Sequence, residues 1–271
     1  MSLPASPLSP VLYLPHGGGP LPLLGDKAHL NLVDFLTGIA PHLGKPSALL
    51  IISAHWEEQQ PTVTSSMAPA LIYDYYGFPE AAYQISYPAL GQPALAEKIR
   101  QLLQVAGLDA ELDEQRGFDH GVFVPLKLMY PHASVPCVQL SLIANLEPAL
   151  HIKIGKALAG LRNENVVILG SGFSFHNPGA LMRHSSTAPD ARNEEFEAWL
   201  AETMTSNEIT EAERQKRLIE WELAPFARYC HPREEHLLPL HVCYGAAGLP
   251  ARQVFNDSVL NKRTSAYLWP S

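Results

Sequence analysis

The chain has 271 residues and a formal net charge of −8 at pH 7. Hydrophobic residues make up 46% of it and charged residues 17%, which provides enough apolar material for a substantial core and too little charge for a disordered chain. The acidic balance argues against a nucleic-acid partner and against binding to an anionic membrane surface.

Signals for secretion, membrane insertion or disulfide formation are absent from the sequence pattern. The first residues, MSLPASPLSP, contain no basic segment followed by a long apolar one. No stretch approaches the ~20 apolar residues of a membrane-spanning helix. The three cysteines, Cys137, Cys230 and Cys243, have irregular spacing that is typical of neither a disulfide framework nor a zinc ribbon. We therefore expect a cytoplasmic protein that does not contact a membrane.

Short apolar runs alternate with helical patterns along the chain. The runs are continuous, as in strands covered on both faces of a sheet, and lie at 11–14, 48–54, 135–142 and 166–171. The helical patterns lie at 93–106, 147–162, 190–204, 208–221 and 233–246. This order predicts an α/β fold: a single domain over residues 1–271, with a mostly parallel or mixed central sheet and helices on both faces.

Three histidines follow predicted strands. His16 in PHGGGP comes after the first strand, His55 in SAHWE after the second, and His176 in GSGFSFHNP after the strand VVIL. Ligands of open α/β sheets bind beyond the carboxyl ends of the strands, so we expect these side chains to meet. Because neutral imidazole is the commonest metal ligand, the sequence predicts a metal or catalytic site at this edge.

The residues beside these histidines allow several interpretations. The glycines after His16 permit positive φ or a close backbone approach, whereas the spacing lacks the GxGxxG and GxxxxGK[ST] patterns of nucleotide sites. We expect Glu57 to accept the ring N–H of His55. His120, in RGFDHGVFVPL, has either a functional role or a structural one at the start of a helix near Val122. Glycines before His176 are expected to allow a sharp turn.

The segment CHPREEHLLPLH contains His231, His236 and His241. We expect Glu234 and Glu235 to lie in the first turn of a helix, where the helix dipole favours negative charge. A separation of five residues does not place the first two histidines side by side on a helix, and spacing does not choose between them as a metal ligand. His241 lies deeper in an apolar pattern and is expected in the core.

Seven motifs of the chain resemble, in their order, those of DODA-type extradiol ring-cleavage dioxygenases. The resemblance covers nearly the whole chain from about residue 10, and the motifs are PHGGGP, SAHWE, YDYYGFPEAAYQISYPALGQP, GFDHGVFVPLKLMYP, VPCVQLSL, GSGFSFHN and HPREEHLLPLHVCYGAAG. These are class III extradiol enzymes, which include 4,5-DOPA dioxygenase and are related to protocatechuate 4,5-dioxygenase. The resemblance implies insertion of O2 into a catechol-type ring, which opens next to its hydroxyls.

The resemblance also implies a set of site residues. A non-haem metal would be held by His16, His55 and His236, with Fe(II) expected for activity and Zn(II) possible in the same site. His176 and His120 would line the catechol site. We favour His176 as the base and then the acid, while the resemblance also allows it as a further metal ligand. In this scheme His120 would hydrogen-bond to dioxygen or to a catechol oxygen.

The expected partners are thus a small catechol and O2. Tyr75, Tyr76 and Phe78 in YDYYGFPE are expected to wall the pocket, and Arg116 and Arg183 are candidates to bind a substrate carboxylate. The sequence selects neither one catechol, nor the ring bond that is cleaved, nor an oligomeric state.

Two departures from the family pattern keep other functions open. Many relatives have HGSP where this chain has HGGGP, so the loop after His16 is one residue longer. The broader class III group uses a carboxylate as its third ligand, whereas three histidines are also the ligand set of some zinc sites. The alternatives are a zinc-dependent hydrolase that activates water and a non-catalytic binding protein on the same fold.

Overall fold

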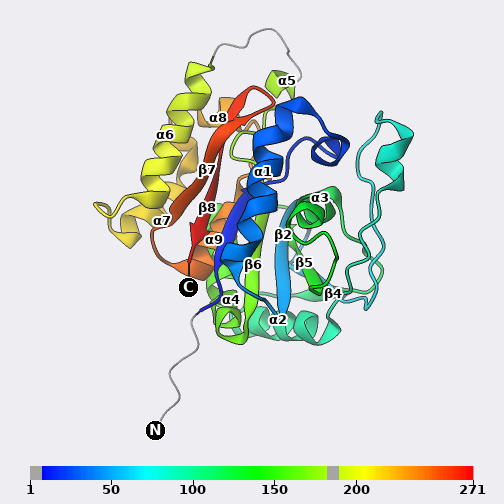
Figure 1. Cartoon of the computed structure of the whole chain (residues 1–271). Coiled ribbons are helices and arrows are strands. Elements are labelled where there is room, and N and C mark those ends of the chain that lie inside the picture. The colour runs from blue at the N-terminus through cyan, green and yellow to red at the C-terminus, as the bar shows by residue number, and fades with distance from the viewer. Residues whose placement is uncertain (1–7, 182–188, 271) are drawn as a thin grey trace.

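The computed structural model describes residues 8–181 and 189–270, and its centre is an 8-stranded sheet (Figure 1). The strand order is β4-β3-β5-β2-β6-β1-β8-β7. The strands are β1 (Val11–Pro15), β2 (Ala48–Glu58), β3 (Thr62–Thr64), β4 (Glu111–Asp113), β5 (Cys137–Ile143), β6 (Val166–Gly172), β7 (Arg252–Val259) and β8 (Lys262–Trp269). This arrangement confirms the predicted α/β class with a mixed sheet.

The four predicted apolar runs form the parallel centre of the sheet. β2 pairs with β5 on one side and β6 on the other, and β1 extends the parallel set beside β6. Leu50 is in register with both Val138 and Ile168, and all three side chains are fully buried. The continuous hydrophobic pattern arises because both faces of these strands are covered.

The hairpin β7–β8 was not predicted from the sequence. β8 pairs antiparallel to β1, and β7 forms the outer edge of the sheet. As a partly exposed edge strand, β7 has a mixed sequence, RQVFNDSV, without the continuous apolar run that marks the central strands. Leu260 and Asn261, with φ of 53° and 61°, form the tight turn between the two strands.

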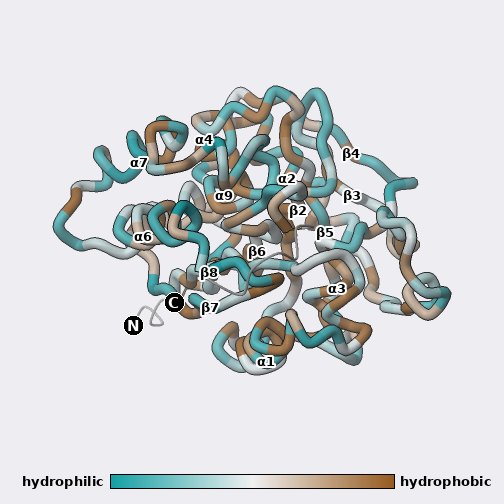
Figure 2. Tube along the Cα trace, turned by 90° about the horizontal axis from the view of Figure 1, so that it is seen from above, coloured by the Kyte–Doolittle hydropathy of each residue, from teal (hydrophilic) through white to brown (hydrophobic). Residues whose placement is uncertain are grey.

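Helices cover both faces of the sheet, as predicted. Figure 2 shows α1 and α3 on one face and α2, α4 and α9 on the other. The α-helices are α1 (Leu30–Ile39), α2 (Pro93–Val105), α3 (His120–Met129), α4 (Pro148–Leu158), α5 (Pro178–Leu181), α6 (Ala191–Thr205), α7 (Glu211–Ile219), α8 (Ala227–Cys230) and α9 (Leu238–Ala247). Short 3-10 helices lie at Leu21–Leu24, Lys27–His29, Ala40–Leu43, Glu80–Gln84, Ala159–Glu164 and Trp221–Leu223. Among the described residues, no helix is long and apolar enough to cross a membrane.

Two glycines bring α4 and α9 into close contact. A Cβ on Gly155 would lie 2.0 Å from the carbonyl oxygen of Val242, and one on Gly245 would lie 2.2 Å from that of Ile152. Only a residue without a side chain tolerates these distances. The close packing holds α9 against the sheet, and so determines where the chain segment that precedes α9 is placed.

The start of α9 differs from the prediction. The helix begins at Leu238, not at residue 233, with Pro239 in its first turn. A proline suits the first turn of a helix, where its missing N–H is not needed for a hydrogen bond. Further along a helix, its ring would clash with the preceding turn. Glu234 and Glu235 therefore precede α9, and the expectation that the helix dipole places them was wrong. His241 is fully buried in the helix, as expected.

Candidate metal centre and active site

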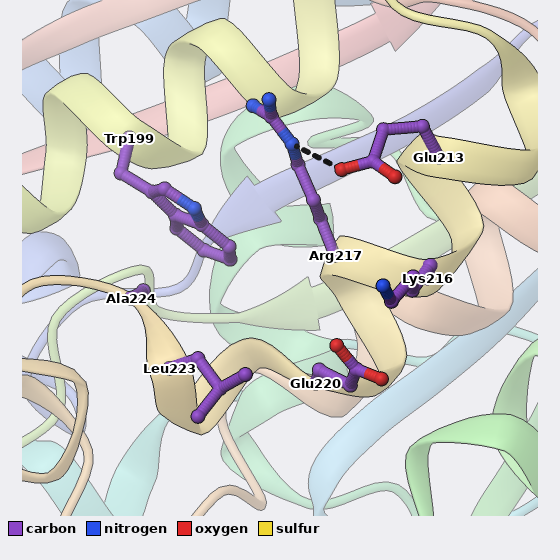
Figure 3. Close-up of a pocket in the computed structure, with 7 residues that line it drawn as sticks. All are labelled: Trp199, Glu213, Lys216, Arg217, Glu220, Leu223 and Ala224. Atoms are coloured by element: carbon purple, nitrogen blue, oxygen red, sulfur yellow. Dashed lines mark hydrogen bonds and ion pairs between the residues drawn. The ribbon is translucent and has the colours of Figure 1, made fainter.

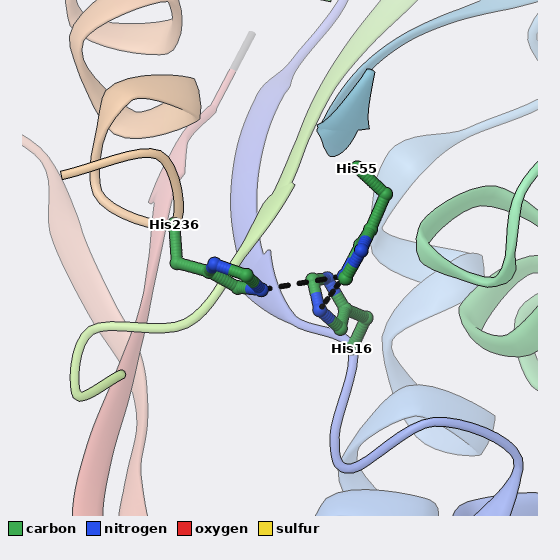
Figure 4. A group of neighbouring side chains, drawn as sticks. All are labelled: His16, His55 and His236. Atoms are coloured by element: carbon green, nitrogen blue, oxygen red, sulfur yellow. Dashed lines mark hydrogen bonds between the residues drawn. The ribbon is translucent and has the colours of Figure 1, made fainter. Parts of the chain in front are cut away.

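Three histidines from distant parts of the chain meet at the carboxyl ends of the central strands (Figure 4). His16 directly follows β1, His55 lies near the end of β2, and His236 precedes α9. The Nε2 atom of His55 is 3.1 Å from that of His16 and 3.3 Å from that of His236. Their rings converge on one point, which is the geometry of ligands to a shared ion.

An irregularity in β2 places His55. Ile52 pairs with Leu140 of β5 and Glu57 with Leu142, so β2 advances five residues where β5 advances two. Such a bulge bends the strand and redirects side chains, and bulges are common next to active sites. His55 lies inside this bulge, whereas a regular strand would carry it past the site.

The last residues of β6 and the chain before α9 approach each other closely, which places His236. A Cβ on Gly172 would lie 2.2 Å from the carbonyl oxygen of His236, and one on Gly170 would lie 2.7 Å from that of Pro239. Neither glycine has positive φ, so they serve close packing and not the sharp turn expected. The His236 carbonyl also accepts hydrogen bonds from Tyr13 Oη and Phe173 N, both at 3.0 Å.

The glycine loop after His16 is held by a hydrogen bond to a second histidine, His29. Gly17 and Gly19 have φ of 84° and 58°, which confirms the expected conformational role of glycine here. Gly18 N donates to Nε2 of His29 at 3.0 Å, while Nδ1 of His29 bonds Asp26 at 2.7 Å. The loop is therefore a defined structure that leads away from His16.

Asp74 bridges one of the converging histidines and a further one. Its Oδ1 accepts hydrogen bonds from His120 Nδ1 at 2.8 Å and from His120 N at 2.9 Å. Its Oδ2 lies 3.4 Å from His55 Nδ1. Burial raises the pKa of Asp74, but the hydrogen bonds from His120 outweigh burial and lower the pKa to about 2. An ionised carboxylate thus orients both rings.

Glu235 bridges a second pair of histidines, His236 and His176, in the same way. Its Oε1 lies 3.0 Å from Nδ1 of His236 and 3.0 Å from Nδ1 of His176. The two rings stack, with centroids 3.4 Å apart and an interplanar angle of 20°. Burial raises the pKa of Glu235, but the hydrogen bond and charge of His176 outweigh it, and the pKa falls below its ordinary value.

The donor set fits a metal ion. His16 Nδ1 lies 3.0 Å from Ser171 Oγ, and this hydroxyl in turn donates to the carbonyl of Gly121, so it accepts from the ring. With Nδ1 of each of the three rings facing Ser171, Asp74 or Glu235, each Nε2 is left with a lone pair. Burial, followed by the charge of neighbouring groups, lowers the pKa of His16, His55 and His236, which keeps the imidazoles neutral.

The distances between the Nε2 atoms also fit ligands of one metal ion. Two nitrogens bonded to one ion at about 2.1 Å lie roughly 3.0–3.4 Å apart when their angle at the ion is about 90–109°. The measured 3.1 and 3.3 Å fall in this range. Two other groups, His55–Asp74–His120 and His176–Glu235–His236, contain a carboxylate and also have their possible ligand atoms within 4.8 Å of one another. Their carboxylates are already engaged in hydrogen bonds to the rings, so the three-histidine set suits a metal best.

Comparison with known proteins agrees with this geometry. Residues 11–267 match the model of the family described as the catalytic LigB subunit of aromatic ring-opening dioxygenase. The chain belongs to this family. It is 38% identical over 250 residues to the 4,5-DOPA dioxygenase extradiol of Mirabilis jalapa, a match that covers 91% of this chain and 90% of that protein. It is 39% identical over 278 residues to the dioxygenase tasH of Hapsidospora irregularis, covering 97% and 86% respectively.

Solved structures show the same fold. The crystal structure of an uncharacterized protein from Escherichia coli K12 matches with a TM-score of 0.78 and 28% identity, over 96% of this chain and 99% of that one. As a member of the LigB family, the chain is a non-haem, metal-dependent extradiol ring-cleaving dioxygenase. It acts on a small aromatic molecule and O2. The zinc-hydrolase and binding-protein alternatives are not favoured.

The five histidines selected from the sequence lie together in this LigB-family structure. We call His16, His55, His120, His176 and His236 the histidine centre. The ring centroid of His120 is 3.9 Å from that of His55 and 5.3 Å from that of His16. The alternative ligand, His231, is buried outside this set, with Nε2 2.8 Å from the carbonyl oxygen of Ser174.

Some contacts and positions of the predicted site residues differ from expectation. Glu57 binds Arg233, and His55 faces Asp74 instead, so the expected partnership between Glu57 and His55 was wrong. The Tyr75 ring lies 5.8 Å from that of His120, whereas Tyr76 is 92% exposed and therefore does not line an enclosed pocket. Helix α3 starts at His120 itself, not near Val122, so this histidine is both a first helical residue and a member of the centre.

Sequence reasoning missed the two bridging carboxylates. Asp74 lies in the tyrosine-rich stretch YDYYGFPE, 46 residues before His120, and nothing local predicts that they meet. Glu235 was considered only for a helix dipole. Its direct adjacency to His236 was a usable signal, because ligand histidines commonly donate their second ring nitrogen to a carboxylate.

A pocket elsewhere on the molecule is separate from this centre. Figure 3 shows it between α6 and α7, and its lining residues are Trp199, Glu213, Lys216, Arg217, Glu220, Leu223 and Ala224. None of the histidines lines it. Among its polar side chains, Arg217 pairs with Glu213. It offers no comparable set of metal ligands or acid–base groups.

Proposed function

We propose that the substrate of this enzyme is a catechol and that Fe(II), held by His16, His55 and His236, is the active metal. The observation that carries the proposal is the convergence of three neutral Nε2 atoms whose opposite ring nitrogens are all anchored. Bound Fe(II) supplies open coordination positions and electron transfer between ring and O2. Zn(II) can bind to the same ligands, but it does not supply that redox chemistry.

His176 is proposed as the acid–base residue and not as a fourth ligand. Glu235 holds its Nδ1, so Nε2 is the atom that exchanges protons. The side chain is 24% exposed, within reach of a small molecule. His176 would take the proton of a catechol hydroxyl when the substrate binds and return a proton to oxygen as the ring opens. The parallel stack on His236 keeps the ring in position for both steps.

His120 is proposed to position substrate or O2. Its Nδ1 and backbone N are both committed to Asp74, which leaves Nε2 as the atom available for a hydrogen bond. Its side chain is only 6% exposed, so it is held more firmly than His176. Tyr75 and Phe78 are proposed to wall the aromatic pocket beside it, since Tyr75 lies next to His120 and Phe78 lies against the Gly19 backbone.

The remaining expectations concern the whole chain. We propose one catalytic domain over residues 1–271, because all described strands join one sheet and the buried hydrophobic residues form one continuous cluster. A cytoplasmic location stays a prediction from the sequence.

The function is tested by oxygen uptake. Metal-stripped protein is reloaded anaerobically with Fe(II), and with Zn(II) as the control, then mixed with a panel of catechols that includes DOPA and protocatechuate. We expect Fe(II)-dependent O2 consumption and a yellow ring-opened product with at least one catechol. Stoichiometric metal binding without O2 uptake on any catechol would contradict the proposal.

A further inference from the structure

An exposed ion pair borders the histidine centre. Arg233 binds Glu57 through two parallel contacts, Nη1 to Oε1 and Nη2 to Oε2, both at 2.5 Å. Arg233 lies three residues before His236, and Glu57 lies two residues after His55, so each partner is attached to a proposed metal ligand. The Arg233 side chain is 52% exposed and that of Glu57 is 23% exposed. The pair therefore lies where the metal centre meets solvent.

Short contacts connect the guanidinium to the acid–base machinery. Nη1 of Arg233 is 3.6 Å from Oε2 of Glu235, whose other oxygen holds His176 and His236. Within the described residues, Oε2 of Glu235 is buried and has no hydrogen-bond partner. The Arg233 guanidinium is therefore separated from His176 and His236 only by the Glu235 carboxylate.

The arginines considered from the sequence differ from Arg233. Nη2 of Arg116 donates to the carbonyl of His55 at 3.2 Å and to Asp119 at 3.3 Å, and its guanidinium lies 4.8 Å from the centre of the Trp56 ring. These contacts give it a structural task. Arg183 lies outside the described residues. Arg233, in contrast, uses only two of its five N–H groups on Glu57 and has no other hydrogen-bond acceptor within the described part of the chain.

We propose that Arg233 is a specificity-determining residue that recognises a carboxylate on the substrate's side chain, and that Glu57 accepts an ammonium group where the substrate has one. The proposal rests on the catechol function above. A guanidinium fork matches a carboxylate in two parallel hydrogen bonds. Asp74, Glu57 and Glu235 make this region acidic, so an anionic substrate needs a cation at the border of the centre. An exposed ion pair by itself adds little stability.

The test uses four catechols that differ only in their side chain: 3,4-dihydroxyphenylacetate, 4-methylcatechol, dopamine and DOPA. For Arg233→Gln we expect KM for 3,4-dihydroxyphenylacetate to rise about tenfold with kcat little changed, and both constants for 4-methylcatechol to stay as in wild type. For Glu57→Gln we expect KM to rise more for dopamine, which carries an ammonium group, than for 3,4-dihydroxyphenylacetate. The matched control is Arg217→Gln, because Arg217 lies in α7 and pairs with Glu202 and Glu213 away from the histidine centre (Figure 3). This variant should not change the kinetic constants for any of the four catechols.

A second measurement separates recognition from turnover. Zn(II)-loaded protein is titrated with 3,4-dihydroxyphenylacetate and 4-methylcatechol by calorimetry, and only the acid should lose affinity in Arg233→Gln. An unchanged KM and affinity for the acid, or equal losses for the acid and 4-methylcatechol, would overturn the assignment while leaving the catechol function intact. Absence of O2 uptake by wild type with every catechol would overturn the function and this assignment together.

Discussion

Asp74 and Glu235 each bridge one proposed metal ligand and one further histidine, yet the two halves of the centre differ in exposure. The Asp74 half holds His120 by its ring and its backbone, and that side chain is 6% exposed. The Glu235 half holds His176 only through its ring and through stacking on His236, and that side chain is 24% exposed.

The tasks proposed for these two chemically identical side chains follow from this difference. A residue that is held by hydrogen bonds to both its ring and its backbone, and is shielded from water, is suited to fixing the position of a bound molecule. A ring that is oriented at one nitrogen and belongs to a more exposed side chain is suited to proton transfer. The comparison predicts that the two halves respond differently to substitution.

The largest effect is expected for the three proposed metal ligands. His236→Ala and His16→Ala should lose the bound metal, and with it all oxygen uptake, because two nitrogens hold an ion far more weakly than three. Metal content after dialysis, measured by plasma emission spectroscopy, checks this. His231→Gln is the control, since His231 is buried nearby but outside the set, and it should retain metal. Retention of metal by His236→Ala would remove that residue from the ligand set.

Loss of the proposed proton-transfer residue, His176, should have the next largest effect. His176→Ala should keep the metal and lower kcat about 10²–10⁴-fold, the usual contribution of a positioned acid–base group. Single-turnover rates and metal content on the same samples separate chemistry from metal loss. Full ring-opening activity in this variant would end the assignment, and loss of metal would instead make His176 a ligand.

The two carboxylates provide the direct comparison of the halves. Asp74→Asn and Glu235→Gln should each weaken metal affinity about 10–100-fold, because each supports one ligand ring. Glu235→Gln should in addition lower kcat at saturating metal, since its partner is the proton-transfer residue. Asp74→Asn should act mainly on the KM for substrate or O2, through His120. Identical kinetic effects of the two variants would show that the halves are not functionally distinct.

The smallest expected effect is on folding stability, and it concerns Glu197, a buried carboxyl that contacts the loop leading to His176. Glu197 accepts hydrogen bonds from Ser174, on the loop that leads to His176, and from Ser265. Burial raises its pKa to about 7. Because the folded state binds this proton more tightly than the unfolded state, the contribution of Glu197 to stability is complete below its ordinary pKa and declines as pH rises toward 7.

Glu197→Gln cannot ionise, so it should become more stable relative to wild type as pH rises from about 5 to 8, by on the order of 2 kcal/mol. Melting temperatures of both proteins across this range measure the difference. A difference that does not vary with pH would show that Glu197 does not change its protonation on folding.

Several parts of the site were predictable because they depend on strand ends. The apolar runs that became β1, β2 and β6 end at or shortly before His16, His55 and His176. Parallel neighbouring strands end at one edge of a sheet, so these side chains were expected to meet. The choice between His231 and His236 was different, since spacing along the chain left it open. Pro239 at the start of α9 and the close contact at Gly172 decide it.

By itself, the sequence determined the α/β class, the central strands and most of the histidines of the centre, because hydrophobic periodicity and strand ends are local properties. Only the tertiary structure decided the partners: Asp74 for His55 and His120, Glu235 for His176, and Arg233 for Glu57. The last pair is separated by 176 residues. Contacts of this kind depend on how loops pack over the sheet edge, through the bulge in β2 and the glycines of β6, and no local pattern encodes them.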